Sequence, residues 1–201
     1  MDRTVSTKVY RESYGIYAAS GMLFNHESPR RGETFVTRKI TMFLAKYING
    51  KKEILRLGNI YAKRDWGYAK DYIESMWLML QQKKPDDFVI ATGSQHSVRD
   101  FIKQCSLNLG IAIKFIGVGL KEKVVVERVL NNKFKFKKGQ TIIKVDKKYF
   151  RPAEVDCLLG DSNKARNRLK WKPTVDFNSL CKEMINYDLN KKNKWKRNFK
   201  I

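Results

Sequence analysis

The sequence is short of acidic residues, cysteines and long apolar runs, and each shortage excludes a class of protein. Its 201 residues hold 20 Asp and Glu against 42 Lys and Arg, a formal net charge of +22 at pH 7. No run of about 18 apolar residues occurs, so we expect no membrane-spanning helix. The first ten residues lack the apolar core of a secretory signal. The cysteines, at Cys105, Cys157 and Cys181, are too few and too scattered for a disulfide framework or a zinc site, and we interpret them as reduced core thiols.

The apolar content that is present suits a folded protein. Hydrophobic residues make up 42% of the chain and aromatic residues 12%, which is enough to bury a core and excludes a wholly disordered basic chain. The length fits one domain, or one domain and part of another. We therefore expect a soluble, cytoplasmic protein that attracts anions.

The positive charge raises a nucleic-acid hypothesis, but its distribution weakens it. Basic residues, mostly Lys, are spread along the whole chain, with denser segments at 133–148 and 191–201. Trp195 and Phe199 in the last segment suit stacking on the bases of a single strand. The alternative is a solvated, disordered tail. A basic surface also concentrates small anionic substrates such as nucleotides.

Strand-like and helix-like segments alternate along the chain. The patterns predict strands over 15–25, 53–57, 88–91, 111–118 and 141–145, and an otherwise less regular region over 120–148. They predict helices over 35–47, 73–80, 98–109, 162–169 and 177–185. Ser97 with Asp100 forms a capping box, and Asn49-Gly50 is a helix stop. This alternation predicts an α/β fold with parallel pairing.

A basic loop follows the first predicted strand. The strand ends in Asn25 and His26, and ligands in α/β sheets bind beyond the carboxyl ends of strands. Beyond it come four cations near a helix start: Arg30, Arg31, Arg38 and Lys39. Such a loop is typical of a phosphate clamp, although a basic surface loop has the same composition. His26 alone fits a hydrogen-bonded scaffold residue as well as a ligand.

Two further segments carry candidate ligand residues. Arg64 stands beside Asp65 at a turn entering a helix, which suits either a second phosphate contact or a structural ion pair. Arg151 precedes Pro152 on a stiff, extended backbone, and Glu154 suits a ribose hydroxyl. Taken singly, none of these segments is specific.

Taken together and in this order, the segments resemble the GDP-mannose 4,6-dehydratase family of extended short-chain dehydrogenases/reductases. The resemblance covers about residues 10–189. It is carried by LFNHESPRRG at 23–32, FVTRKI at 35–40, RDWGYAKDY at 64–72, DDFVIATG at 86–93, HSVRDF at 96–101, YFRPAEVD at 149–156 and LKWKP at 169–173. Two positions depart from the family pattern: Tyr68 replaces an expected His and Ala153 an expected Thr.

The resemblance implies a reaction and a fold. Members of the family oxidise C4 of the mannose with NADP, remove water across C5 and C6, and return the hydride to C6, giving GDP-4-keto-6-deoxymannose, the precursor of GDP-fucose and GDP-rhamnose. The implied fold is the C-terminal part of a Rossmann-like NAD(P)-binding fold with its smaller substrate-binding domain. We expect residues 1–93 to form the distal part of the Rossmann-like sheet with interleaved substrate-binding segments, 94–190 mainly the substrate domain, and 191–201 a basic, disordered tail.

The resemblance also assigns ligand residues. For NADP it implies His26 and Arg31. For GDP-mannose it implies five residues, the arginines contacting the diphosphate: Asn25, Lys39, Arg64, Arg151 and Glu154. The loop near Arg30 reaches a neighbouring subunit in the family, which implies a homo-oligomer or a partner that carries the N-terminal half. No metal is implied.

Two parts of the expected catalytic machinery are missing from this sequence. No Gly-x-x-Gly-x-x-Gly occurs; the nearest segment is Gly117-Val-Gly119. The Tyr-x-x-x-Lys at Tyr47 to Lys51 contains the helix stop Asn49-Gly50 and follows the basic loop, whereas the family's catalytic pair precedes it. We therefore expect the catalytic Tyr and Lys to lie upstream of Met1, and the chain alone neither to bind NADP tightly nor to turn over GDP-mannose. The alternatives are an inactive remnant or split subunit that needs a partner, and a basic nucleic-acid-binding module.

Overall fold

The computed structural model describes residues 3–50, 53–131, 136–150, 153 and 155–198. The chain forms two compact units, each assembled from three segments. The first unit comprises 1–27, 64–95 and 158–177, and the second comprises 28–63, 96–157 and 178–201. The units are therefore interleaved in the sequence, whereas the sequence pattern predicts boundaries at residues 93 and 190. Which unit binds which ligand stays a prediction.

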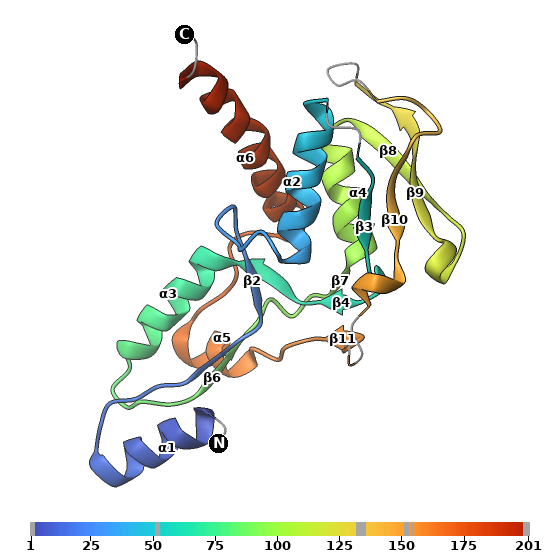
Figure 1. The fold of residues 1–201 in the computed structure, drawn as a ribbon. Helices are drawn as coiled ribbons and strands as arrows, with labels where there is room; N and C mark the ends of the chain where they lie inside the picture. The colour runs from blue at the N-terminus through green and yellow to red at the C-terminus, as the bar shows by residue number, and fades with distance from the viewer. Residues whose placement is uncertain (1–2, 51–52, 132–135, 151–152, 154, 199–201) are drawn as a thin grey trace. The chain divides into compact units, whose positions relative to one another are not determined.

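The first unit is built on two parallel strand pairs. Strand β1 (Gly21–Leu23) pairs with β6 (Phe88–Ile90), and β2 (Asn25–Glu27) pairs with β5 (Trp66–Tyr68). Its helices are α1 (Arg3–Tyr14), α3 (Ala69–Leu80) and α5 (Asn163–Leu169) (Figure 1). The predicted parallel pairing is confirmed for both pairs.

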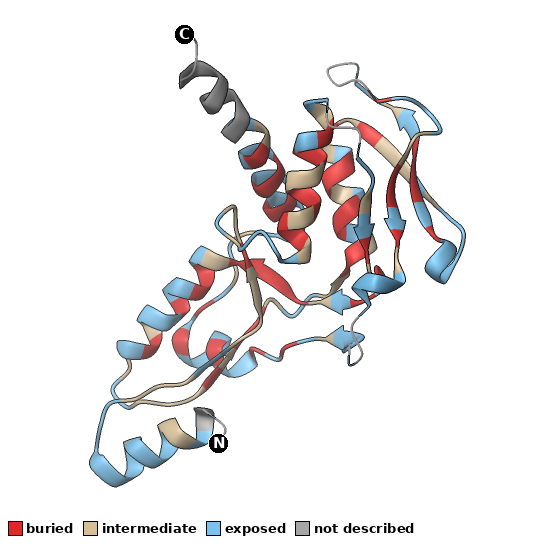
Figure 2. Cartoon of the chain, viewed as in Figure 1, coloured by how far each residue is buried: buried red, intermediate tan, exposed pale blue. Residues whose placement is uncertain are grey.

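The core of the first unit joins one strand to two helical segments. Its buried residues come from α3, from β6 and from the α5 region: Tyr72, Met79, Phe88, Ile90, Ala165, Leu169 and Trp171. Figure 2 shows the buried positions of α3 along one side of that helix. These contacts link residues about a hundred positions apart, so the third segment is as necessary to this unit as the first two.

The apolar face of α3 differs from the one that its sequence predicts. The pattern of Ile73, Met76, Trp77 and Leu80 at helical spacing predicts a buried stripe. In the structure the helix is present, but Ile73 and Trp77 are 63% and 60% exposed. Tyr72, Ser75 and Met79 are buried instead. Periodicity therefore identifies the helix correctly, whereas tertiary packing decides which face is covered.

The second unit is built on a mixed four-stranded sheet. Its strand order is β3-β10-β9-β8, with β3 and β10 parallel and the other two pairs antiparallel. The strands are β3 (Leu55–Leu57), β8 (Ile111–Ile116), β9 (Lys123–Val129) and β10 (Thr141–Val145). Helices α2 (Val36–Ile48) and α4 (Val98–Asn108) pack beside this sheet (Figure 1). The sheet is thus only partly parallel, and the prediction of parallel pairing does not extend to β8 and β9.

Helix α4 follows the predicted capping chemistry. The Ser97 hydroxyl accepts a hydrogen bond from the Asp100 amide at 3.1 Å, and the Asp100 carboxylate accepts one from the Ser97 amide at 2.8 Å. Burial raises the pKa of Asp100, but the hydrogen bonds from Ser97 outweigh it and hold that pKa below its usual value. The helix ends where Gly110 adopts a φ of 71°. The capping box is confirmed.

Three local predictions need correction. Within residues 15–25 the strands begin only at Gly21, with β1 over Gly21–Leu23 and the start of β2 at Asn25, and helix α1 precedes them, because Arg3–Tyr14 contains no Gly or Pro to stop a helix. The Val-rich segment Lys123–Val129 forms strand β9 rather than irregular chain. Helix α6 (Phe177–Asn198) extends beyond the predicted helix over 177–185 to Asn198, again without an interrupting Gly or Pro.

The remaining elements are short. They are β4 (Lys63–Arg64), β7 (His96–Ser97), β11 (Cys157–Leu158) and two single 3₁₀ turns, η1 (Gly119–Lys121) and η2 (Lys147–Tyr149). Cys105 and Cys181 are buried, as predicted, but Cys157 on β11 is exposed, so its interpretation as a core thiol is wrong. Among the helices described, none is both long and apolar enough to cross a membrane.

Candidate functional site

Strand β2 carries two of the predicted ligand residues. Asn25 and His26 are half-buried and stand opposite Trp66 and Gly67 of the parallel strand β5. The strand ends at the buried Glu27, after which the chain enters the basic loop. Because ligands of α/β sheets bind at the carboxyl ends of parallel strands, this end of β2 is where the structure offers a ligand site.

The ring of His26 is held in one orientation. Its Nδ1 lies 2.9 Å from the backbone oxygen of Phe24, and its ring centroid lies 5.3 Å from that of Tyr72. Since a carbonyl oxygen only accepts hydrogen bonds, Nδ1 carries a proton and donates it. In the neutral ring Nε2 is then the acceptor. His26 can therefore offer a fixed acceptor to a ligand hydroxyl or amide.

Tyr72 packs against His26 within the first unit. Its hydroxyl is buried and has no hydrogen-bond partner among the residues described. Burial raises the pKa of Tyr72 well above its usual value, and the carboxylates of Asp65, Asp71 and Glu27 raise it further. A Cβ on Gly67 would lie 2.4 Å from Cε2 of Tyr72, so only glycine fits there. Tyr72 is thus a neutral packing partner for His26.

A buried carboxylate fixes the loop that follows β6. Asp65 is fully buried, and its carboxylate accepts hydrogen bonds from the Thr92 hydroxyl at 2.7 Å, the Thr92 amide at 2.9 Å and the Gly93 amide at 2.9 Å. Arg166 donates to the Thr92 carbonyl at 2.7 Å. These bonds satisfy the buried carboxylate of Asp65 and backbone donors that the end of β6 leaves unpaired. They hold residues 92–93 at the carboxyl end of β6.

A second buried carboxylate fixes the start of α3. Asp71 accepts hydrogen bonds from the Thr174 hydroxyl at 2.6 Å and from the amides of Thr174 and Val175. The indole of Trp171 donates to the Asp71 carbonyl at 2.8 Å. The segment LKWKP at 169–173, which carries part of the family resemblance, thus has a structural role within this unit.

Arg64 lies on an extended segment and not at a helix entrance. It is half-buried on β4, and β5 separates it from helix α3, which begins at Ala69. The interpretation of this segment as a turn entering a helix is therefore wrong. The adjacent Asp65 amide donates to the Leu158 carbonyl at 3.1 Å, and the Asp65 carboxylate binds Thr92 and Gly93. The backbone beside Arg64 is consequently well anchored.

The basic loop belongs to the second unit and closes on Ser28. The Arg31 amide donates to the Ser28 carbonyl at 2.9 Å, and the Arg30 amide donates to the Ser28 hydroxyl at 3.1 Å. The guanidinium of Arg31 lies 3.6 Å from the centroid of the Phe35 ring. This stacking holds the planar guanidinium while its edge can still contact a phosphate. Arg30 is exposed.

The four cations that the sequence predicts for a phosphate clamp, in the loop and at the start of α2, differ in their contacts. Arg38 is buried on α2 and forms an ion pair with the buried Asp188 of α6. It therefore has a structural role and is not part of a phosphate clamp. Lys39 is half-buried, and its Nζ lies 5.8 Å from the centroid of the Tyr149 ring. Arg31 and Lys39 remain candidates.

Tyr149 leads into the last predicted ligand segment. A Cβ on Gly58 would lie 2.2 Å from the Tyr149 carbonyl oxygen, so the chain at residue 149 can run there only beside a glycine. Arg151 and Glu154, the two candidates that follow, lie outside the described residues. The assignments of all seven predicted ligand residues stay predictions. Among the residues described, no cluster of His, Cys, Asp or Glu is suited to hold a metal ion.

Sequence patterns alone do not identify the supports of this site. Asp65, Tyr72 and Thr92 hold its residues in place without being predicted ligands. Each of the acids Asp65 and Asp71 stands between a cation and an aromatic residue, so the sequence alone gives no clear signal that they are buried and hydrogen-bonded.

A known family model and curated relatives match most of the chain. The model described as GDP-mannose 4,6 dehydratase matches residues 3–184. The GDP-mannose 4,6 dehydratase of Dictyostelium discoideum is 54% identical over 180 residues, 90% of this chain and 48% of that protein. Those of Vibrio cholerae and Homo sapiens are 52% and 50% identical, over 90% of this chain and 49% and 46% of their own lengths. The chain thus spans about half the length of these relatives.

Solved structures share the fold at low sequence identity. RMD from Pseudomonas aeruginosa, complexed with NADPH, aligns with a TM-score of 0.71 at 15% identity, over 93% of this chain and 53% of that chain. The dTDP-glucose 4,6-dehydratase of Bacillus anthracis, in complex with NAD, aligns with a TM-score of 0.68 at 14% identity, over 96% and 51%. The predicted fold class, α/β and part of the Rossmann-like extended short-chain dehydrogenase/reductase fold, is confirmed.

Proposed function

Because this chain belongs to the GDP-mannose 4,6 dehydratase family, we propose that it binds GDP-mannose and takes part in its conversion to GDP-4-keto-6-deoxymannose. The observation that carries the proposal is the match to the family model over residues 3–184, with 54% identity to one curated relative across 180 residues. The product is a precursor for deoxysugars such as GDP-fucose or GDP-rhamnose. The proposal places the protein in the cytoplasm.

The proposed substrate contacts are mainly cationic. Arg64 and Arg151 bind the diphosphate, Lys39 adds a further positive charge, Asn25 hydrogen-bonds the nucleotide sugar, and Glu154 accepts from a hydroxyl. Charge-assisted hydrogen bonds of this kind contribute about 1.5–3 kcal/mol each, so three cations account for much of the affinity for a diphosphate. The anchored backbone beside Arg64 supports this role, since a pre-positioned guanidinium loses less entropy on binding.

The proposed cofactor is NADP, held in part by His26 and Arg31. Both residues fit such a group: the orientation of His26 fixes an acceptor at Nε2, and Arg31 presents a stacked, planar guanidinium of the type that binds phosphates. The cofactor, when bound, would accept a hydride and later return it. The chain's own contribution is to position the dinucleotide.

No proton-transfer role is assigned to a residue of this chain. Helix α2, which carries Tyr47, ends at Ile48, and Gly50 has a φ of 98°, whereas Lys51 lies outside the described residues. Tyr47 is also buried and stacked 5.5 Å from the Phe136 ring, and burial raises its pKa. Tyr47 therefore serves the core, and we do not assign it the acid–base role of the family's Tyr/Lys pair.

The proposal includes assembly with another subunit. Arg30 is exposed on the basic loop, where the family resemblance expects contact with a neighbouring chain. We propose a homo-oligomer or a complex with a partner that carries the N-terminal half. Light scattering on a size-exclusion column measures which assembly forms.

Binding of GDP-mannose to the chain tests the proposed function. Isothermal titration calorimetry should show saturable binding of GDP-mannose that weakens about tenfold or more in Arg64→Gln, because one charge-assisted contact to the diphosphate is lost. Lys182→Gln, an exposed change on α6 with the same loss of charge, should leave the affinity within about twofold. Equal weakening by both variants, or no saturable binding, would overturn the proposal. With NADP added, we expect no dehydration by the chain alone.

A further inference from the structure

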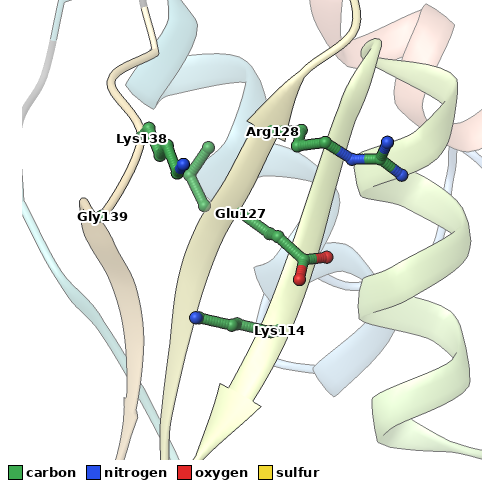
Figure 3. Close-up of a pocket in the computed structure, with 6 residues that line it drawn as sticks. Lys114, Glu127, Arg128, Lys138 and Gly139 are labelled. Carbon is green, nitrogen blue, oxygen red and sulfur yellow. The ribbon is translucent and has the colours of Figure 1, made fainter.

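An open cavity of about 380 Å³ lies in the second unit, and none of the residues that line it is a predicted ligand residue. It is lined by three cations, one acid and two small or apolar residues: Lys114, Arg128, Lys138, Glu127, Val126 and Gly139. Figure 3 shows that these side chains come from β8, from β9 and from the segment that precedes β10. The cavity is therefore built by three separate stretches of one sheet.

A β-bulge places two of the charged residues side by side. In the antiparallel pair β8–β9, Ala112 stands opposite Arg128 and the next residue, Ile113, stands opposite Val126, so Glu127 is the additional residue. A regular strand would turn Glu127 and Arg128 to opposite faces. With the bulge, both are exposed while Val126 before them is buried. Bulges often re-aim side chains in this way beside binding sites.

A tight turn fixes the third cation. The Gln140 amide donates to the Lys137 carbonyl at 3.2 Å, and Gly139 has a φ of 82°, which is the geometry of a type II turn with Lys138 at its second position. The Gly139 amide donates to the Val126 carbonyl at 2.8 Å, and the Val126 amide donates to the Gln140 carbonyl at 2.9 Å. The turn is thus bonded to β9 beside the bulge, and its orientation is set by the backbone.

The positive charge of the cavity has no internal counterion. Among the described residues, no hydrogen bond or ion pair involves the side chains of Lys114, Arg128 or Lys138, and Glu127 pairs with none of them. Three cations and one carboxylate leave a local charge of +2 in one open cavity. Like charges gathered on rigid backbone repel one another, so an anion that contacts all three is favoured.

We propose that this cavity is a second anion site, which binds the diphosphate group of a small phosphorylated ligand. Lys114, Arg128 and Lys138 contact the phosphate oxygens, and Arg128 does so with a planar fork that matches phosphate geometry. Glu127 lies where it would accept a hydrogen bond from a hydroxyl of the same ligand. No residue of this cavity belongs to the proposed GDP-mannose or NADP contacts.

The lining favours a small ligand over a nucleic acid. Sites for single strands alternate cations with aromatic side chains on which bases stack. Here the described lining has no aromatic residue, and the carboxylate of Glu127 would repel a continuous chain of phosphates. A compact diphosphate with a hydroxyl-bearing group matches the charges and the acceptor of this lining.

Titration of the full chain with sodium pyrophosphate, followed by amide chemical shifts, tests the proposal. We expect saturable shifts at Glu127, Arg128 and Gly139, and an affinity at least about tenfold weaker in Lys114→Gln/Arg128→Gln. The matched control, Lys46→Gln/Lys182→Gln, removes two exposed cations elsewhere in the same unit and should change the affinity at these amides by less than about threefold. Glu127→Gln should strengthen pyrophosphate binding, a gain that misfolding cannot produce.

Three results would overturn the proposal. One is the absence of saturable shifts at these amides. Another is equal weakening by the cavity variant and its control, which would show a general charge effect. The third is binding of an oligothymidylate at these amides in preference to pyrophosphate. Because the shifts at Glu127, Arg128 and Gly139 report this cavity alone, each result is independent of whether GDP-mannose binds elsewhere.

Discussion

The hydroxyl of Thr92 donates a 2.7 Å hydrogen bond to the buried carboxylate of Asp65. Thr92 follows β6, and Asp65 immediately precedes β5, so the contact joins the ends of two strands that belong to different pairs of the first unit. The same carboxylate accepts hydrogen bonds from the amides of Thr92 and Gly93. One acid therefore organises the strand ends around Asn25 and His26.

Asp65→Ala should destabilise the chain strongly. It removes three hydrogen bonds to a buried, charged acceptor and leaves the amides of Thr92 and Gly93 without that partner, at a cost of about 3 kcal/mol in the free energy of unfolding. Urea unfolding followed by circular dichroism measures this. Glu74→Ala removes an exposed acid of α3 and should stay within about 0.5 kcal/mol of the wild type. A loss for Asp65→Ala as small as that control would contradict the assigned role.

Thr174→Val should cost about 1–2 kcal/mol in the free energy of unfolding. The substitution keeps the side-chain shape but removes the 2.6 Å hydrogen bond to Asp71, which then loses a charge-assisted donor. Thr174→Ser retains the hydroxyl and should lose less than half as much. Equal losses in the two variants would mean that the methyl group, and not the hydrogen bond, supports this segment.

In this chain the sequence predicts local secondary structure more accurately than it predicts which residues are buried. The helix at 98–108 and its stop at Gly110 follow from Ser97, Asp100 and a glycine in the left-handed region, all of which act within a few residues. The face of α3 is decided by distant partners: Tyr72 is buried because Trp171, about a hundred residues later, packs against it. Such long-range contacts leave no trace in periodicity.

The residues of the candidate site also divide into those that the sequence reveals and those that come together only on folding. His26 and Arg31 are conspicuous in the sequence because of their chemistry, whereas the supports Asp65 and Thr92 come together only on folding. Arg38 shows the limit of reading charge alone, since it stands one residue from Lys39 yet is buried against Asp188. The cavity cations Lys114, Arg128 and Lys138 come from separate segments of the sequence, and only the bulge and the turn place them in one lining.

A double-mutant cycle at Arg38 and Asp188 should show strong coupling between α2 and α6. Both side chains are nearly fully buried, so Arg38→Met or Asp188→Leu alone leaves an uncompensated buried charge and should cost about 3–5 kcal/mol. The double variant removes both charges and should be less destabilised than the sum of the two single variants. Urea unfolding of all four proteins measures the coupling. Additive losses would show that the two residues stabilise the unit independently.

The ion pair between Arg11 and Asp87 should make stability depend on pH in the acid range. Arg11 donates two hydrogen bonds to the Asp87 carboxylate, at 2.9 and 3.0 Å. The hydrogen bond from Arg11 lowers the pKa of Asp87; burial opposes the shift, and the Ser20 amide reinforces it. A carboxyl whose pKa is lower in the folded than in the unfolded chain stabilises the fold above its unfolded pKa, about 3.9, and the stabilisation is lost as the pH falls through the folded value.

Asp87→Asn should therefore be less stable than the wild type by about 1 kcal/mol at pH 6. The difference should shrink as the pH is lowered from about 4 to 2, because the wild-type carboxyl becomes protonated as well. Arg11→Gln should show the same convergence, since it removes the other half of the pair. Urea midpoints measured every half unit between about pH 2 and 6 test this. If wild-type and Asp87→Asn curves run parallel over this range, the carboxylate of Asp87 does not stabilise the attachment of α1 through its charge.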